Sequence, residues 1–106
     1  MNRVKVLYVS NMDTTRILLA LDYDTPNDIA VKAITEKIME TELYDIDKDE
    51  YFQETGMTPE NFEDIARQIW YYNDSYYLDN RWEATYGISG LVEVINKDTQ
   101  LLTEVE

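Results

Sequence analysis

The side chains in this sequence that could do chemistry are almost all carboxylates, because histidine and cysteine are both absent. The chain therefore lacks the commonest general base, the commonest zinc ligand and every thiolate nucleophile. The serines, at positions 10, 75 and 89, have no histidine to activate them. We expect no catalytic residue, no metal site and no cofactor.

The carboxylates are concentrated in the middle of the chain. Of 106 residues, 22 are acidic and 9 are basic, which gives a net charge of −13. Residues 1–35 hold four acids and four bases, whereas residues 36–64 hold eleven acids and two bases. Such a density of like charge is repulsive, and folding alone gives no reason for it. The candidate partner-binding acids in this segment are Glu36, Glu40, Glu42, Asp45, Asp47, Asp49, Glu50 and Glu54.

The alternating acids of residues 45–49 resemble the start of a calcium-binding EF-hand loop, which places oxygen ligands at positions one, three and five. The rest of the loop does not fit. Its sixth position, which needs glycine, is Glu50, and its twelfth, which needs a bidentate glutamate, is Gly56. The pattern therefore does not predict an EF-hand.

Aromatic residues form a second concentration, with seven of the 13 between positions 70 and 86. Neighbouring side chains on a helix or strand point in different directions, so a tyrosine pair cannot bury both rings in one pocket. We expect Trp70, Trp82 and one ring of each pair to be core, and the other ring to be exposed for binding. The candidates here are Tyr71, Tyr72, Asp74, Tyr76, Tyr77 and Asp79.

Extended apolar runs at residues 4–10 and 14–24 predict two strands joined by a turn at residues 11–13. Threonine followed by proline at Thr25 and at Thr58 predicts two helix starts, with the threonine as N-cap. The apolar stripe of the first helix ends near Leu43.

Two further strands are predicted at residues 87–95 and 100–105, around a turn at 96–99. Residues 81–86 fit either a strand or a helix extension, and the glycines at 87 and 90 fit a bend at the start of a strand. The order β-β-α-α-β-β predicts one α+β domain over residues 1–106, with two helices on one face of an antiparallel sheet.

No apolar run reaches membrane-spanning length, and the amino terminus lacks a signal-peptide core. We expect a cytoplasmic protein that does not bind a membrane. Its acidity opposes direct binding to nucleic acid and favours a basic protein as partner.

In size, acidity and the layout of acids and tyrosines, the chain resembles small inhibitors encoded by phages and mobile elements, namely anti-CRISPR and anti-restriction proteins that mimic DNA. It also resembles, more loosely, the acidic immunity proteins that neutralise nuclease toxins. The resemblance implies a non-catalytic inhibitor that occupies the nucleic-acid-binding surface of a nuclease or CRISPR effector. Two alternatives stay open: an interaction module or homo-oligomer subunit whose acidity serves solubility, and a metal-dependent enzyme using a carboxylate cluster.

Overall fold

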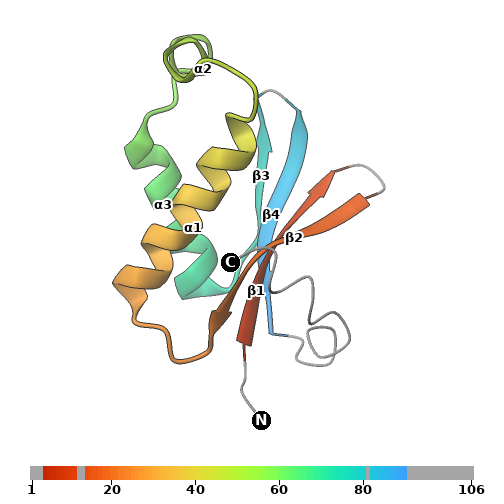
Figure 1. Ribbon diagram of the computed structural model, residues 1–106, viewed down its shortest axis with the longest axis vertical. Helices are drawn as coiled ribbons and strands as arrows, with labels where there is room; N and C mark the ends of the chain where they lie inside the picture. Colours follow the sequence, from red (N-terminus) through yellow and green to blue (C-terminus); the bar gives the residue numbers. More distant parts are fainter. Residues whose placement is uncertain (1–3, 12–13, 81, 91–106) are drawn as a thin grey trace.

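The computed structural model describes residues 4–11, 14–80 and 82–90, which form one four-stranded sheet and three helices (Figure 1). All neighbouring strands pair antiparallel in the order β2-β1-β4-β3, so the first and last of the described strands lie side by side at the centre. The elements are β1 (Val4–Asn11), β2 (Thr14–Asp22), α1 (Asn27–Glu42), α2 (Lys48–Thr55), α3 (Pro59–Tyr72), β3 (Tyr76–Asp79) and β4 (Glu83–Ser89).

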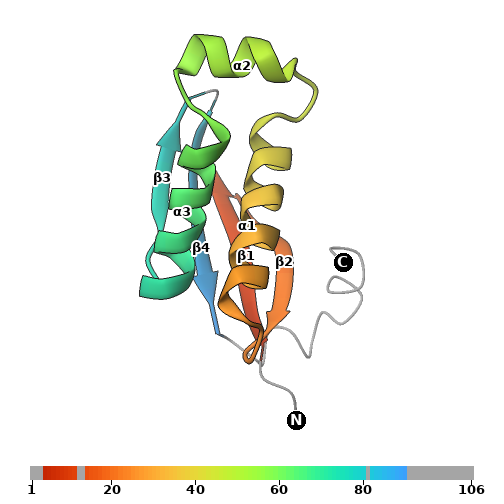
Figure 2. The ribbon, with the colours of Figure 1, turned by 90° about the vertical axis from the view of Figure 1, so that its left-hand side faces the viewer.

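The helices cover one face of the sheet. Helices α1 and α3 pack side by side and run in opposite directions, and α2 lies across the end where α1 finishes and α3 begins (Figure 2). The predicted α+β class is therefore confirmed. The prediction of two helices is wrong, because the acidic segment between them contains α2.

The core lies between the sheet and the two long helices. Leu7 and Val9 of β1 pair with Ile88 and Tyr86 of β4, and all four side chains are buried. Because side chains alternate between the faces of a strand, this register turns one apolar face toward the helices. The buried apolar residues of the two long helices are Ala30, Val31, Ile34 and Ile38 on α1 and Phe62, Ile65, Ala66, Ile69 and Trp70 on α3.

The two predicted helix starts differ in detail. At α3 the backbone N–H of Asn61 donates to Thr58 Oγ1 at 3.2 Å, and the Thr58 N–H donates to Asn61 Oδ1 at 2.9 Å. This reciprocal capping box confirms the prediction. At α1, Pro26 occupies the N-cap position and the Thr25 hydroxyl donates to the carbonyl of Asp22. The predicted capping role of Thr25 is therefore wrong.

The last described strands depart from the prediction. Of the two alternatives for residues 81–86, the strand is confirmed from Glu83 onward, where it is continuous with the predicted strand from residue 87 in β4. The short β3 before it was not predicted. Gly87 lies within β4 opposite Tyr8, so it is not a bend. The predicted turns at 11–13 and 96–99, the end of the predicted strand at 87–95 and the predicted strand at 100–105 fall wholly or partly outside the described residues.

Within the described residues, no helix is long and apolar enough to cross a membrane.

Candidate protein-binding surface

The end of the molecule at which α2 lies, called here the α2 end, carries a dense set of exposed carboxylates. In sequence, residues 38–66 contain ten acidic residues and a single basic residue, Lys48. The strand β3 also points toward this end (Figure 2), and the Asn80 side-chain amide donates to Tyr51 Oη on α2 at 3.0 Å. The exposed acids of the α2 end are Glu40, Asp45, Asp47, Asp49, Glu50, Glu54, Asp79 and Glu83.

Helix α2 holds its acids on a defined backbone. Asp47 caps its N-terminus by accepting the backbone N–H of Glu50 at 3.0 Å. Gly56 ends it in the left-handed region, at a φ of 75°, where glycine has no steric cost. Between these caps, Tyr51 is buried against the core. The carboxylates of α2 therefore project from a helix that is fixed at both ends and on its inner face.

Glu42 is not part of this surface, although the sequence analysis placed it there. Its side chain is 0% exposed, at the last residue of α1. Tyr51 Oη donates to Oε1 at 3.0 Å, while Tyr86 Oη and Trp82 Nε1 donate to Oε2 at 2.6 and 3.1 Å. The prediction that Glu42 binds a partner is corrected: its carboxylate joins α1, α2 and β4 inside the protein.

The Tyr86 hydroxyl remains a hydrogen-bond donor in this cluster. Burial raises the pKa of Tyr86 far above its ordinary value, and the hydrogen bond to Glu42 raises it further. The positive charge of Arg16 partly opposes this increase. The phenol therefore stays protonated through the neutral range and continues to stabilise the buried carboxylate.

Glu36 lies outside the α2 end, on the outer face of α1. It lines a groove of about 650 Å³ between α1 and α3, together with Asp28, Lys32, Arg67 and Tyr71. On α3, Arg67 forms ion pairs of 2.6 and 3.1 Å with Glu63 and Asp64. This outer face mixes both signs of charge, unlike the α2 end.

The structure separates the tyrosine pairs. Tyr71 and Tyr72 are 51% and 73% exposed at the C-terminal end of α3, opposite the α2 end, and Asp74 follows them. Tyr76 is half-buried against the core. The expectation of one exposed ring per pair holds for Tyr76 and Tyr77, whereas both rings of the other pair are exposed.

Tyr77 lies on the sheet face that points away from the helices. Its neighbour Leu78 is buried in the core, and alternation turns Tyr77 the other way, 55% exposed. Its hydroxyl donates to Glu83 Oε1 at 2.7 Å, across from β3 to β4. This hydrogen bond is the main cause that raises the pKa of Tyr77 to about 12. Among the candidate residues between positions 70 and 86, Tyr77 and Asp79 are therefore the ones that lie beside the acids of the α2 end.

Tyr44 was missed by the sequence analysis. Its ring is 71% exposed, directly after the C-cap of α1 at Leu43 and before Asp45. The sequence did contain a signal for its exposure. The apolar stripe of the helix ends at Leu43, so an aromatic residue that follows in an acidic segment has no buried helix face on which to lie.

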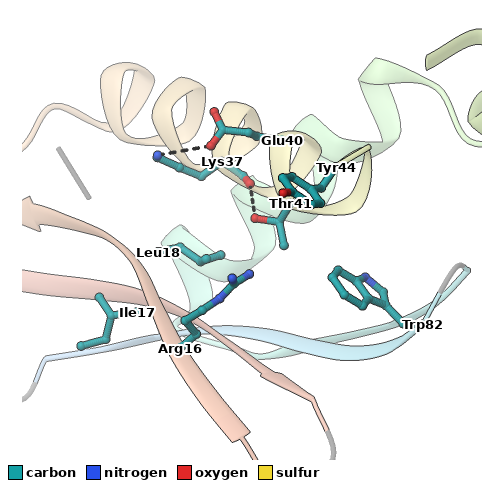
Figure 3. A pocket seen from close by; sticks show the side chains of 8 residues that line it. All are labelled: Arg16, Ile17, Leu18, Lys37, Glu40, Thr41, Tyr44 and Trp82. Atoms are coloured by element: carbon teal, nitrogen blue, oxygen red, sulfur yellow. Dashed lines mark hydrogen bonds and ion pairs between the residues drawn. The ribbon is translucent and has the colours of Figure 1, made fainter. Parts of the chain in front are cut away.

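Trp82, expected in the core, is only partly buried and lines a groove with Tyr44 between α1 and β2 (Figure 3).

A scan of the chain against protein-family models found no match, and searches of curated proteins and of solved structures also found none. Within the described residues, the acidic α2 end carries exposed Tyr44 and Tyr77 among its carboxylates, and a groove lies beside it.

Proposed function

We propose that this protein is a non-catalytic inhibitor that binds a basic, nucleic-acid-binding surface of a nuclease or CRISPR effector in the cytoplasm and blocks access of nucleic acid. The observation that carries the proposal is the fixed helix α2, whose exposed carboxylates stand at the end of the molecule with few cations among them. A protein that needed acidity only for solubility would gain nothing from concentrating and ordering it, because like charges repel.

The spacing of the acids supports mimicry of a phosphate backbone. Glu50 and Glu54 are four residues apart on α2, about 6 Å along the helix axis. This is close to two phosphate steps on one DNA strand, at about 3.4 Å each. Both carboxylates are exposed, whereas Tyr51 on the same helix is buried. The lysines and arginines of a DNA-binding groove would therefore meet carboxylates at a separation similar to that of DNA phosphates.

The exposed tyrosine rings at this end supply the specificity for one partner that carboxylates alone lack. Acids steer a basic partner but discriminate little between basic proteins. Tyr44 and Tyr77 each present a large apolar surface with a hydroxyl, the kind of side chain that dominates binding hot spots and stacks on arginine. We therefore assign the anchoring role to Tyr44 and Tyr77, in place of Tyr71 and Tyr72.

The proposal is tested by competition with DNA. Labelled DNA is bound to each member of a panel of purified RNA-guided nucleases, restriction endonucleases and nuclease toxins, and the protein is added at low and at high salt. We expect the protein to displace DNA from at least one of these enzymes, more weakly as salt rises. A nuclease toxin inhibited without displacement of DNA would favour an immunity-type protein instead.

Two triple variants with the same net charge make this test specific. Asp49→Asn, Glu50→Gln and Glu54→Gln neutralise the α2 end, while Asp22→Asn, Asp24→Asn and Asp74→Asn neutralise exposed acids elsewhere. Removing three charges from −13 leaves −10 in both. We expect the first to weaken competition about tenfold, about 1.4 kcal/mol, and the second to change it little. Equal effects of the two triple variants would mean that only the net charge of the protein matters, not the position of the acids. If the protein displaced DNA from none of the enzymes, the proposal would be refuted.

A further inference from the structure

Beside the α2 end, a groove separates the last turns of α1 from β2 (Figure 3). It consists of two adjoining hollows of about 550 and 480 Å³, which share Arg16, Thr41 and Trp82 in their walls. Lys37 and Tyr44 line the first hollow, and the residues particular to the second include Asn11, Thr14 and Thr15. Cavities of about 300 to 1,000 Å³ with a few polar groups are typical of small-molecule sites.

The aromatic wall of the groove is held in place from behind. Trp82 Nε1 donates to the buried carboxylate of Glu42, which Tyr51 and Tyr86 also bind. This hydrogen bond therefore holds the indole in one rotamer at the edge of the groove. A ring held in this way offers a stacking surface that requires no ordering when a planar ligand binds.

The walls of the groove carry two cations, Arg16 and Lys37, and one acid, Glu40. In Figure 3 the Arg16 guanidinium projects from β2 toward α1, between Thr41 and Leu18. Arg16 forms no ion pair with another described residue, and the Lys37 ammonium is 3.5 Å from the exposed Glu40 carboxylate. Glu40 lines the same hollow as Lys37, so among the described residues Arg16 is the cation of this groove that has no carboxylate in ion-pair contact.

We propose that this groove binds a nucleoside monophosphate, a ligand whose planar base and phosphate match the two kinds of wall. The base stacks on Trp82, and the phosphate accepts from the guanidinium of Arg16 and from Lys37, the side chains whose donors suit phosphate oxygens. The hydroxyl and amide groups of Thr14, Thr15 and Asn11 in the second hollow suit the ribose. The groove shares Glu40 and Tyr44 with the acidic surface of the proposed function, but the inference does not depend on that function.

Tryptophan fluorescence gives a direct test. The second tryptophan, Trp70, lies on α3 and donates to Asn27, so Trp70→Phe leaves Trp82 as the single reporter. We titrate this variant with adenosine 5′-monophosphate, with adenosine and with inorganic phosphate. We expect saturable quenching by the monophosphate and affinities about tenfold or more weaker for the other two, since each has only half of the contacts.

Charge variants in the same background separate a site from general attraction. Arg16→Gln and Lys37→Gln should each weaken binding of the monophosphate several-fold. Arg67→Gln, which removes an exposed arginine of the α1/α3 groove, is the matched control and should leave it unchanged. The proposal is overturned if the monophosphate gives no saturable quenching, if phosphate alone binds as well, or if all three variants behave alike.

Discussion

At the scale of single residues, the fate of a carboxylate depends on the donors around it. Glu42 and Glu40 are two positions apart on α1, yet the first is buried and the second is exposed. A buried ionised carboxylate is tolerated when hydrogen bonds replace its hydration, and Glu42 accepts from Tyr51, Trp82 and Tyr86. Glu42 is therefore a structural anchor, whereas Glu40 is a surface charge.

Glu42→Gln should lower the free energy of unfolding by about 2 to 4 kcal/mol. The amide nitrogen of glutamine is a donor, so one of the three hydroxyl and indole donors would face another donor. Glu40→Gln on the same helix is the control and should change stability by less than about 0.5 kcal/mol. Urea unfolding of both variants measures the difference, and equal midpoints would contradict an anchoring role for Glu42.

Tyr77 makes stability depend on pH at the alkaline end. The hydrogen bond to Glu83 raises the pKa of Tyr77 to about 12 in the folded protein, while that of an unfolded tyrosine is about 10. The contribution of Tyr77 is thus complete below pH about 10 and is lost as the pH rises through about 12. The difference in urea midpoint between the parent and Tyr77→Phe should remain constant up to pH about 10 and then shrink. A difference that persists to pH 12 would show that the protonated phenol is not what stabilises the fold.

At the scale of elements, α2 is short and depends on its caps. A helix of eight residues has little stability of its own, so Asp47 at its start and Tyr51 on its inner face must both hold it. Asp47→Ala should cost about 1 kcal/mol and lower the hydrogen-exchange protection of α2. Thr58→Ala, the cap of α3, should cost a similar amount without affecting α2. Unchanged protection of α2 in Asp47→Ala would mean that Tyr51 suffices to hold the helix.

The centre of the sheet depends on a contact between β1 and β4. Tyr8 lies opposite Gly87, and a Cβ added to Gly87 would overlap the Tyr8 ring and hydroxyl. The ring covers the glycine, as aromatic residues do across a sheet. Gly87→Ala should therefore cost about 1 to 3 kcal/mol.

A double-mutant cycle identifies the contact as the cause. In the background of Tyr8→Ala, which is itself destabilising, the added cost of Gly87→Ala should shrink to below about 1 kcal/mol, because the overlapping ring is gone. Additive costs in urea unfolding would show that the ring does not limit the size of residue 87.

At the scale of the whole molecule, negative charge is concentrated at one end. The exposed Tyr71 and Tyr72 lie at the end of α3, and the acids of α2 lie at its beginning (Figure 2). The net charge of −13 is thus neither uniform nor neutralised by neighbours. The molecule therefore has a strongly negative end, within which the like charges repel one another.

Salt should therefore stabilise the fold. Raising sodium chloride from about 0.01 M to about 0.1 M shortens the Debye length from about 30 Å to about 10 Å and screens the repulsion among the acids. We expect the thermal midpoint to rise over this range, and to rise less in the triple variant of Asp49, Glu50 and Glu54. A midpoint that falls with salt would mean that favourable ion pairs outweigh the repulsion.

The sequence alone determined the features that depend on neighbours in the chain. Extended apolar runs predicted β1 and β2, and the Thr58-Pro59 start predicted α3 with its cap. These signals work because strand alternation, helical periodicity and capping are each set within a few residues. The α+β class and the acidic middle of the chain followed from them.

Only the tertiary structure decided which candidate residues share a surface. Glu42 is buried by Trp82 and Tyr86, which are 40 and 44 positions away in the chain, so no local pattern distinguishes it from its exposed neighbours. Likewise, the antiparallel packing of α3 carries Tyr71 and Tyr72 away from the acids, while the pairing of β3 with β4 brings Tyr77 and Asp79 toward them. Burial and proximity arise from contacts between distant segments, and these exist only once the helices have packed on the sheet.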